Sequence, residues 1–275
     1  MLISNEVHPA RRKALQANIE RCGMWNVLIT GYDGRTLGEL LQGTCDKVLL
    51  DAPCSGEGMQ YKSGVRCFQW NEKAVKKLAY LQKSLLIAGL RALKVGGELV
   101  YATCTTNTLE NEGVIESVMK EVGVAAEVMD IEVTEKSKGY SEQYADKVAR
   151  FRPHIHHTGG FFLAKLKKKG TLPAALQQPH ETNVSLLKDW ERSDALQQKV
   201  RAYGKAQGWK FPASSAMVFV QTKFTIWVVA KDALACLDEL FVEQVGVPVL
   251  KILKDGTWKP LDGWKKLFLF FDKVF

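Results

Sequence analysis

The sequence predicts an α/β protein in which a doubly wound, mostly parallel sheet is followed by a smaller α+β module. Strand-like runs alternate with amphipathic helical runs over residues 1–169, which is the pattern of a mostly parallel sheet. A polar stretch over residues 170–184 has the composition of an interdomain linker. The remaining residues 185–275 mix helical and strand patterns, so we expect a second, smaller domain there.

Six strands are predicted in the first domain from short runs of apolar and β-branched residues. In chain order they are LISNEV, NVLITGYD, DKVLLDAP, GELVYATC, VAAEVMDIE and GFFLAKLK.

Three helices are predicted between these strands from apolar residues spaced three and four apart. The first begins at Pro9, which suits a first helical position, and stops at Gly23. The second follows Asn71 and should end at the glycine pair Gly96 and Gly97. The third runs to about Val122 from a cap supplied by Asn107 or Thr108.

The second domain should contain two helices and two strands. These are a helix near 185–203, a strand MVFVQTKFTIWVVA, a short helix near 232–243 and a strand PVLKILKDG. Five tryptophans fall in this part, and we expect most of them to pack in its core. They are Trp190, Trp209, Trp227, Trp258 and Trp264.

The composition predicts a globular cytoplasmic protein. The 275 residues are 46% apolar and 25% charged, and no apolar run approaches the roughly 18 to 20 residues that a membrane-spanning helix needs. The six cysteines show neither a disulfide framework nor a CxxC metal clamp. The net charge of +8 weakly favours a polyanionic partner.

Two predicted strands end in the same way, because each delivers a thiol to its carboxyl end. Cys54 follows a proline and precedes a glycine-rich turn, and Cys104 lies among threonines. Ligands of open parallel sheets bind outside the carboxyl ends of the strands. An isolated cysteine is more often a small buried apolar residue. Neither cysteine lies inside an apolar run, however, so we interpret the pair as functional.

The sequence resembles the Sun/Fmu family of S-adenosylmethionine-dependent RNA (cytosine-5) methyltransferases. DAPCSGEG and YATCT are similar to its two cysteine motifs, and NEVHPARRKALQANIERCG and GGFFLAKLK fit its other segments in order and spacing. The resemblance covers residues 1–169. It implies a Rossmann-like class I methyltransferase domain, S-adenosyl-L-methionine as cofactor, and RNA as partner, with ribosomal RNA of the bacterial type preferred.

The resemblance implies a role for each cysteine. Carbon 5 of cytosine is a poor nucleophile, and addition of a thiolate to carbon 6 activates it. Cys104 is then the attacking thiolate, and Cys54 assists release of the product. Asp51 would contact the N3/N4 edge of the cytosine, although it could be only a turn aspartate. DNA cytosine methyltransferases are the alternative within this chemistry, and they use the Pro-Cys cysteine as nucleophile.

The resemblance also implies a donor site. Glu6 is expected to contact the ribose and Asp33 to lie beside the adenine, with Asp51 and Pro53 at the same site. Alternatively, Glu6 could be only a residue that precedes a helix, and Asp33 only a turn aspartate. The family's glycine-rich loop and its strand would lie before Met1. We therefore expect the chain to be N-terminally incomplete and inactive alone, as a fragment or the product of a late start site.

The remaining expectations concern RNA contacts and assembly. The family commonly has an arginine where this chain has Tyr61, so Lys62 and Arg66 are predicted to contact RNA instead. Residues 185–275 occupy the position of the PUA-like RNA-binding module that many family members carry.

The histidines of RPHIHHTGG share one face of an expected strand, but they lack companion ligands, so no metal is assigned. We expect a monomer without membrane contact. The alternatives are a non-catalytic RNA-binding protein or a transfer RNA cytosine-5 methyltransferase.

Overall fold

The computed structural model describes residues 1–61, 71–173, 190–209, 211, 216–240 and 242–265. The chain divides into two compact units. Unit 1 consists of Met1–Asp33 together with Thr182–Phe275, and unit 2 is Gly34–Glu181. This division differs from the expected boundaries, because the first 33 residues group with the C-terminal part and not with residues 34–169.

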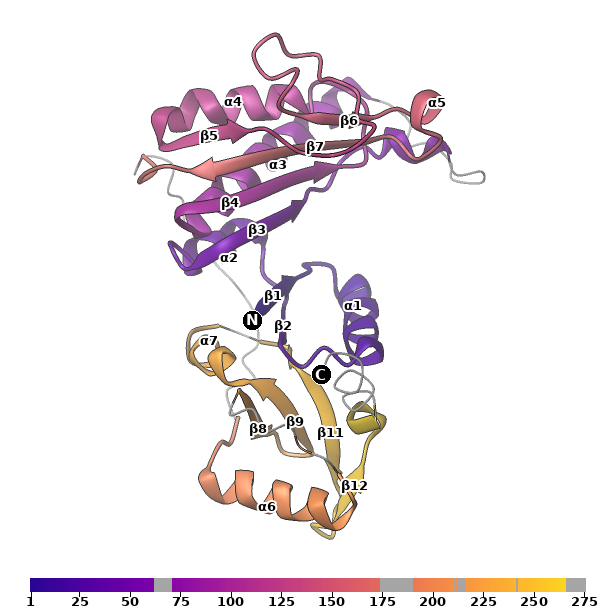
Figure 1. The fold of residues 1–275 in the computed structure, drawn as a ribbon, viewed down its shortest axis with the longest axis vertical. Helices are drawn as coiled ribbons and strands as arrows, with labels where there is room; N and C mark the ends of the chain where they lie inside the picture. Colours follow the sequence, from indigo (N-terminus) through magenta and orange to yellow (C-terminus); the bar gives the residue numbers. More distant parts are fainter. Residues whose placement is uncertain (62–70, 174–189, 210, 212–215, 241, 266–275) are drawn as a thin grey trace. The chain divides into compact units, whose positions relative to one another are not determined.

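Unit 2 is built on a five-stranded sheet (Figure 1). Its strands in spatial order are β3 (Cys45–Asp51), β4 (Leu93–Thr103), β7 (Phe161–Lys168) and β5 (Ala126–Met129), with β6 (Ala149–Phe151) also paired to β7. The pair β3 and β4 is parallel, whereas β7 runs antiparallel to β4, β5 and β6. The sheet is therefore mixed, and its parallel part is the β3–α3–β4 crossover.

Three main helices belong to unit 2: α2 (Gly34–Leu40), α3 (Glu72–Ala92) and α4 (Glu112–Val122). Figure 1 shows α3 and α4 on one face of the sheet. Asn71 caps α3 as expected, since its side chain accepts hydrogen bonds from the backbone N–H groups of Lys73 and Ala74. Shorter elements are η1 (Glu57–Tyr61), η2 (Gly123–Ala125) and α5 (Pro153–His156).

The bounds of two predicted helices in unit 2 were wrong. α3 ends at Ala92, and Gly96 instead adopts a positive φ of 88° inside β4. α4 begins at Glu112, after Asn111, which makes no side-chain cap. Asn107 does not start the helix, because its side-chain oxygen accepts the N–H of Glu110 in the preceding turn. Asn107, which the sequence suggested as a helix cap, therefore stabilises the turn that precedes α4.

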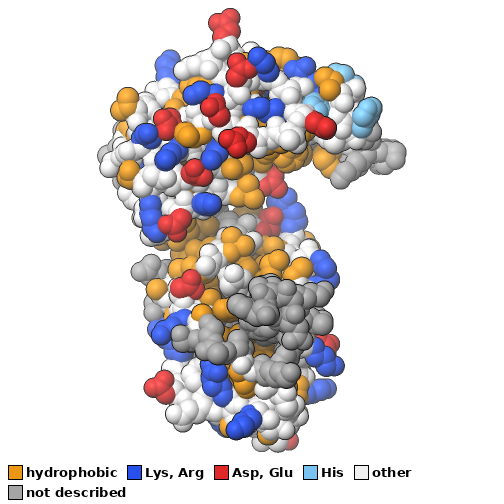
Figure 2. Space-filling model, in the orientation of Figure 1, with side chains coloured by type: hydrophobic (Ala, Val, Ile, Leu, Met, Phe, Trp, Pro, Cys, Tyr) orange, Lys and Arg blue, Asp and Glu red, His pale blue; other side chains and the backbone are white. Residues whose placement is uncertain are grey.

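The core of unit 2 lies between the sheet and α3 and α4. It contains Leu86 and Leu90 from α3, Ile115 and Val118 from α4, and Tyr101 from β4 among its fully buried members. On the face that Figure 2 presents, acidic and basic side chains are interspersed. Unit 2 also contains ion pairs between its strands and their ends, since Lys165 pairs with Glu98 and Lys169 with Glu127 at 3.1 Å each.

Unit 1 contains two sheets. The first has the order β1 (Leu2–Asn5), β2 (Val27–Thr30) and β10 (Gln244–Val245), with β1 and β2 parallel and joined through α1 (Pro9–Cys22). Gly23 ends α1 with a φ of 66°, as expected of a left-handed cap. The second has the order β12 (Trp258–Pro260), β11 (Val247–Ile252), β9 (Thr225–Ala230) and β8 (Met217–Gln221), and its described neighbours are antiparallel.

The C-terminal part of unit 1 is an α+β module, as predicted. The predicted strand MVFVQTKFTIWVVA is a hairpin, because the chain turns between β8 and β9 at residues 222–224. α7 (Leu234–Glu239), which follows η4 (Lys231–Ala233), lies within the predicted helix near 232–243, whereas α6 (Asp194–Ala206) begins and ends later than the helix predicted near 185–203. Each of the five tryptophans is buried or half-buried, and Trp209 stacks on Trp264 at 4.0 Å between ring centroids.

The alternating helix and strand segments confirm the predicted α/β class. No helix among the described residues combines the length and apolar character needed to cross a membrane.

Candidate functional site

The parallel pairing of β3 and β4 brings the two predicted cysteines together. Asp51 at the end of β3 is in register with Ala102, and the N–H of Ala52 donates to the Ala102 carbonyl at 3.0 Å. The chain beyond each strand therefore leaves the sheet at the same edge. The Sγ atoms of Cys54 and Cys104 lie 3.3 Å apart, both half-buried. We call these two residues the cysteine pair.

The two thiols of the cysteine pair do not ionise independently. Burial, together with the hydrogen bond and negative charge of the neighbouring Cys104 thiolate, raises the pKa of Cys54 to about 12, from an ordinary value of 9.0. At neutral pH Cys54 therefore keeps its proton. The Sγ–H of Cys54 can then donate a hydrogen bond to the Cys104 sulfur, 3.3 Å away.

Backbone contacts join the two loops that carry the cysteines, which are the proline-cysteine loop (residues 52–58) and the threonine-cysteine loop (residues 104–107). The N–H of Gly58 donates to the carbonyl of Cys104 at 2.9 Å, and the N–H of Gly160 donates to the carbonyl of Gly58 at 2.9 Å. A Cβ on Gly58 would lie 2.2 Å from the Gly160 oxygen. This contact requires glycine, and it brings the loop before β7 to the same site.

Asp51 and Pro53 lie where the sequence predicted them, at the carboxyl end of β3. Both side chains are exposed, so a ligand at this edge of the sheet can reach them. The side-chain amide of Gln82 on α3 donates to the Pro53 carbonyl at 2.8 Å and holds the turn in place. An exposed carboxylate beside two thiols can accept hydrogen bonds from an amino group or a protonated ring nitrogen.

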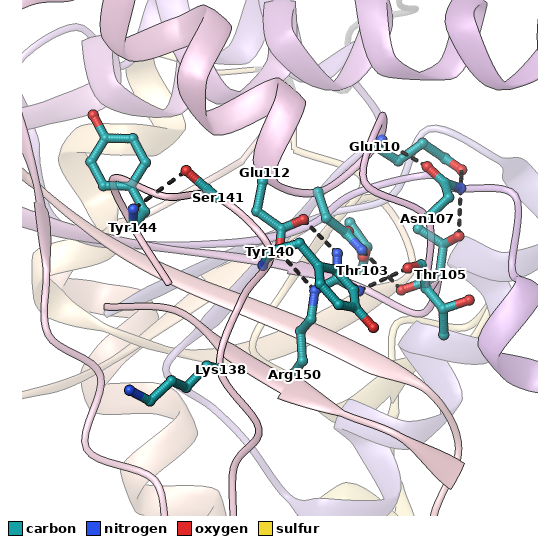
Figure 3. Close-up of polar contacts among 12 residues, drawn as sticks. Thr103, Thr105, Asn107, Glu110, Glu112, Lys138, Tyr140, Ser141, Tyr144 and Arg150 are labelled. Carbon is teal, nitrogen blue, oxygen red and sulfur yellow. Dashed lines mark hydrogen bonds and ion pairs between the residues drawn. The ribbon is translucent and has the colours of Figure 1, made fainter. Parts of the chain in front are cut away.

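A buried polar network beneath the cysteine pair was missed by sequence reasoning. Glu110 is fully buried and accepts hydrogen bonds from Ser55, Gln82 and Asn107. Asn107 also donates to Thr105 at 2.9 Å (Figure 3). The run NTLENEG resembles the acidic first turn of a helix, so nothing in the sequence indicated that Glu110 lies in a buried network. The feature that could have indicated it is an acidic residue six positions after a predicted catalytic cysteine.

A second buried carboxylate, Glu112, stabilises the threonine-cysteine loop through Arg150. Figure 3 shows the Arg150 side chain directed at Glu112; its Nε lies 2.7 Å from Oε1, and its Nη2 contacts Oε2. The side chains of this ion pair are 3% and 4% exposed. Arg150 also donates to the Thr106 carbonyl at 2.8 Å and stacks over the Tyr140 ring at 4.5 Å. Its charge is thereby satisfied on several sides.

The predicted ribose and adenine contacts lie in unit 1, at the carboxyl ends of the parallel strands β1 and β2. The N–H of Glu6 donates to the Thr30 carbonyl at 3.1 Å, so Glu6 leaves the sheet beside the strand that leads to Asp33. The Glu6 carboxylate accepts hydrogen bonds from the N–H of His8 at 2.7 Å and from Arg11 at 3.0 Å. Two carboxylates at adjoining strand ends are chemically suited to a nucleoside's hydroxyl and amino groups, so these residues fit the donor in part.

The predicted RNA contacts Lys62 and Arg66 lie outside the described residues. The histidines of RPHIHHTGG do not form the expected strand, because residues 153–156 make the single turn α5. The Nδ1 atom of His156 accepts the N–H of Arg152 at 2.8 Å. Figure 2 shows the histidines gathered at one end of unit 2. Among the residues that the structure describes, no three metal-ligating side chains cluster.

Comparison with known proteins places these features in context. The family model described as 16S rRNA methyltransferase RsmB/F matches residues 1–167. The chain is 29% identical over 262 residues to ribosomal RNA small subunit methyltransferase F of Erwinia tasmaniensis, covering 93% of this chain and 52% of that protein. It is 31% identical over 259 residues to the protein of the same name from Shewanella amazonensis, covering 93% and 54%. The chain thus spans about half the length of these curated relatives.

Solved structures show the same likeness in the fold. The crystal structure of NSun6 from Pyrococcus horikoshii with SFG, an analogue of S-adenosylmethionine, is 33% identical and covers 62% of this chain and 41% of its own, with a TM-score of 0.53. A methyltransferase homologue from the same organism is 31% identical, covers 60% and 52%, and has a TM-score of 0.51. The Rossmann-like class I methyltransferase fold that the sequence predicted is therefore confirmed.

Proposed function

The chain belongs to the RsmB/F family of 16S rRNA methyltransferases, and on that premise we propose that it methylates carbon 5 of a cytosine in ribosomal RNA, with S-adenosylmethionine as methyl donor. The observation that carries the proposal is the 3.3 Å separation of the Cys54 and Cys104 sulfurs at one sheet edge. The names of the relatives support ribosomal RNA of the small subunit as substrate. Two adjacent thiols support the cytosine-5 reaction, which requires one thiol to add and a second group to release it.

Cys104 is the nucleophile in this proposal. Its thiolate adds to carbon 6 of cytosine, forming a C–S bond and shifting the electrons of the 5,6 double bond toward carbon 5. When bound, the donor would supply an electrophilic methyl group, and carbon 5 would take it as the methyl–sulfur bond breaks and the donor leaves as a neutral thioether. The raised pKa of Cys54 supports this division, since a thiol that keeps its proton at neutral pH is the poorer nucleophile.

Cys54 acts in the release step. Once Cys104 is bonded to carbon 6 it carries no negative charge, so the hydrogen bond and charge of Cys104 no longer raise the Cys54 pKa, although burial, the largest cause, still does. In this proposal Cys54 gives up its proton to solvent and accepts the proton from carbon 5. The electrons of that C–H bond re-form the 5,6 double bond, and the C–S electrons return to Cys104.

The other predicted residues are proposed to bind and orient the cytosine, the methyl donor and the RNA. Asp51 is exposed at the strand end, where its carboxylate would accept hydrogen bonds from the N3/N4 edge of the cytosine and stabilise the charge that develops during addition. Glu6 and Asp33 are proposed as contacts to the donor's ribose and adenine, and Asp51 and Pro53 as further donor contacts. Residues 185–275 are proposed as a PUA-like RNA-binding module, and Lys62 and Arg66 as further RNA contacts.

Bisulfite sequencing tests the proposal directly, because 5-methylcytosine resists the deamination that converts cytosine to uracil. RNA from cells with the intact gene, without it, and with Cys104→Ala would be compared. We expect one cytosine of small-subunit ribosomal RNA to resist conversion only with the intact gene. A change confined to transfer RNA would show that transfer RNA, and not ribosomal RNA, is the substrate. No change at any cytosine would support the non-catalytic RNA-binding alternative.

A further inference from the structure

Glu110 occupies the centre of the buried network beneath the cysteine pair. Its side chain is fully buried, and its Oε1 accepts the N–H of Ser55 at 2.9 Å and the side-chain amide of Gln82 at 2.8 Å. Its Oε2 accepts the Ser55 hydroxyl at 2.5 Å and the Asn107 amide at 2.6 Å. One carboxylate therefore receives four hydrogen bonds, each from a neutral donor.

Three of these four donors come from the two loops that carry the thiols. Ser55 follows Cys54 directly, and Asn107 lies three residues after Cys104. The Ser55 and Thr105 hydroxyls are also 2.9 Å apart, so the residues that follow the two cysteines contact each other. Gln82 adds a third attachment, because the same amide group donates to the Pro53 carbonyl at 2.8 Å.

A carboxylate is the side chain that suits this position. An ionised carboxylate only accepts hydrogen bonds and has about four lone-pair sites, which matches the four donors. A glutamine of the same size would place an N–H₂ group against other donors, whichever way the amide was turned. Burying a charge is costly, so a neutral side chain would be expected here if filling space were the only requirement.

We infer that Glu110 is a positioning residue that holds the two cysteine loops in register, so that the sulfurs of Cys54 and Cys104 stay at contact distance. The inference deepens the proposed function, since it assigns the geometry of that site to a group that does not touch the substrate. Positioning of this kind is demanding, because a misplacement of about 1 Å can lower a rate by about 100-fold.

The rate of disulfide formation within the cysteine pair measures this geometry without RNA or methyl donor. Diamide serves as the oxidant: one thiolate adds to its N=N bond, and the second thiolate displaces the resulting hydrazine, leaving a disulfide. Mass spectrometry of the full chain follows the Cys54–Cys104 peptide pair, and the exposed Cys22 gives an internal reference for thiol reactivity. We expect Glu110→Gln to slow the reaction about tenfold or more.

Val118→Ala is the matched control, because it shortens a fully buried side chain on α4, which lies outside both loops in the sequence. It should lower stability and leave the disulfide rate unchanged. Ser55→Ala removes one of the four donors and should slow the reaction in the same direction by a smaller factor. This second variant also decides the matter if Glu110→Gln fails to fold. Wild-type rates in Ser55→Ala, or in a folded Glu110→Gln, would overturn the inference.

The assay separates this inference from the proposed function. If the disulfide rate falls in Glu110→Gln while bisulfite sequencing finds no modified cytosine in wild-type cells, the positioning role stands and the methyltransferase proposal fails. If wild-type cells carry the modified cytosine and the disulfide rate is insensitive to Glu110, the methyltransferase proposal stands and the positioning role fails.

Discussion

At the scale of single residues, the site depends on two thiols with unequal surroundings. Cys54 and Cys104 are 3.3 Å apart, and Cys54 keeps its proton at neutral pH, since burial and the neighbouring Cys104 both raise its pKa. The asymmetry depends on Cys104 remaining unbonded. It follows that the two cysteines should fail in different ways when each is removed.

Alanine substitutions test this division of roles, and they are made in a protein preparation that methylates RNA. Cys104→Ala should abolish methylation and form no adduct, because the cytosine is never activated. Cys54→Ala should still add and methylate but release the product slowly, so a protein–RNA complex should survive denaturing electrophoresis. The opposite pattern, with the adduct lost in Cys54→Ala and kept in Cys104→Ala, would mean that the roles are exchanged as in DNA-type enzymes.

The pH dependence of alkylation tests the coupling between the thiols. Because the folded-state pKa of Cys54 is raised to about 12, its reaction with iodoacetamide should stay slow through pH 9 and rise only as the pH approaches that value. Cys104→Ala removes the neighbouring thiolate but not the burial, so the midpoint should move to lower pH. The exposed Cys22 provides a reference in the same sample. An unchanged midpoint would show that the two thiols are not coupled.

At the scale of elements, the site is held by loops that pack through backbone contacts. The proline-cysteine loop meets the turn before β7 at Gly58 and Gly160, where no side chain fits. The strand β3, which leads into that loop, pairs with β4 among the described strands, and Leu49 on it is 75% exposed. The same strand therefore orders the site and presents an edge to solvent.

The glycine contact predicts a localised sensitivity. In Gly58→Ala the new Cβ would meet the Gly160 oxygen at 2.2 Å, so one backbone segment must shift. We expect a loss of about 1 to 3 kcal/mol of unfolding free energy, measured by urea denaturation, and, when Gly58→Ala is combined with Cys54→Ala, loss of the covalent RNA adduct. Gly170→Ala is the matched control, because nothing lies within 4 Å of its Cβ and its φ is not in the positive range. Equal stability of the two variants would contradict this packing.

The edge of β3 predicts self-association. Unpaired strand edges with exposed apolar side chains template pairing with other chains, and a charged side chain blocks it. We expect the 275-residue chain to aggregate on concentration and Leu49→Lys to remain monomeric to higher concentrations, as measured by light scattering. Tyr80→Lys, at another exposed position, on α3, is the control and should leave aggregation unchanged. A wild-type chain that stays monomeric and melts reversibly would show that this edge is protected.

At the scale of the whole molecule, the predicted donor contacts are divided between units. Glu6 and Asp33 belong to unit 1, whereas Asp51, Pro53 and the cysteine pair belong to unit 2.

Binding of S-adenosylmethionine to this chain should be weak. Carboxylates at two strand ends can bind ribose and adenine, but the glycine-rich loop that cradles such ligands is not found in these 275 residues. Isothermal titration should give no saturable heat with micromolar donor. Glu6→Gln should leave the titration unchanged, since little affinity is present to lose. Micromolar affinity of the wild type would refute this prediction.

Sequence alone determined which residues could carry the chemistry. Cys54, Cys104, Asp51 and Pro53 were identified from motifs that follow strand-like runs, and the structure places them at one sheet edge. Most helices and strands were also predicted, because apolar periodicity and caps such as Asn71 are local properties. Such features need only a few neighbouring residues to be recognised, so a single sequence contains them.

Tertiary structure decided what depends on contacts between distant segments. The antiparallel course of β7, the pairing of β2 with β10 and the close approach of Gly58 to Gly160 each join residues far apart in the chain. The role of Glu110 has the same origin, since its four donors come from three separate segments and none is visible in the run NTLENEG. Local patterns report which face of an element is apolar. Which buried groups meet is settled only when the elements pack, because each polar group buried there must then find its partner.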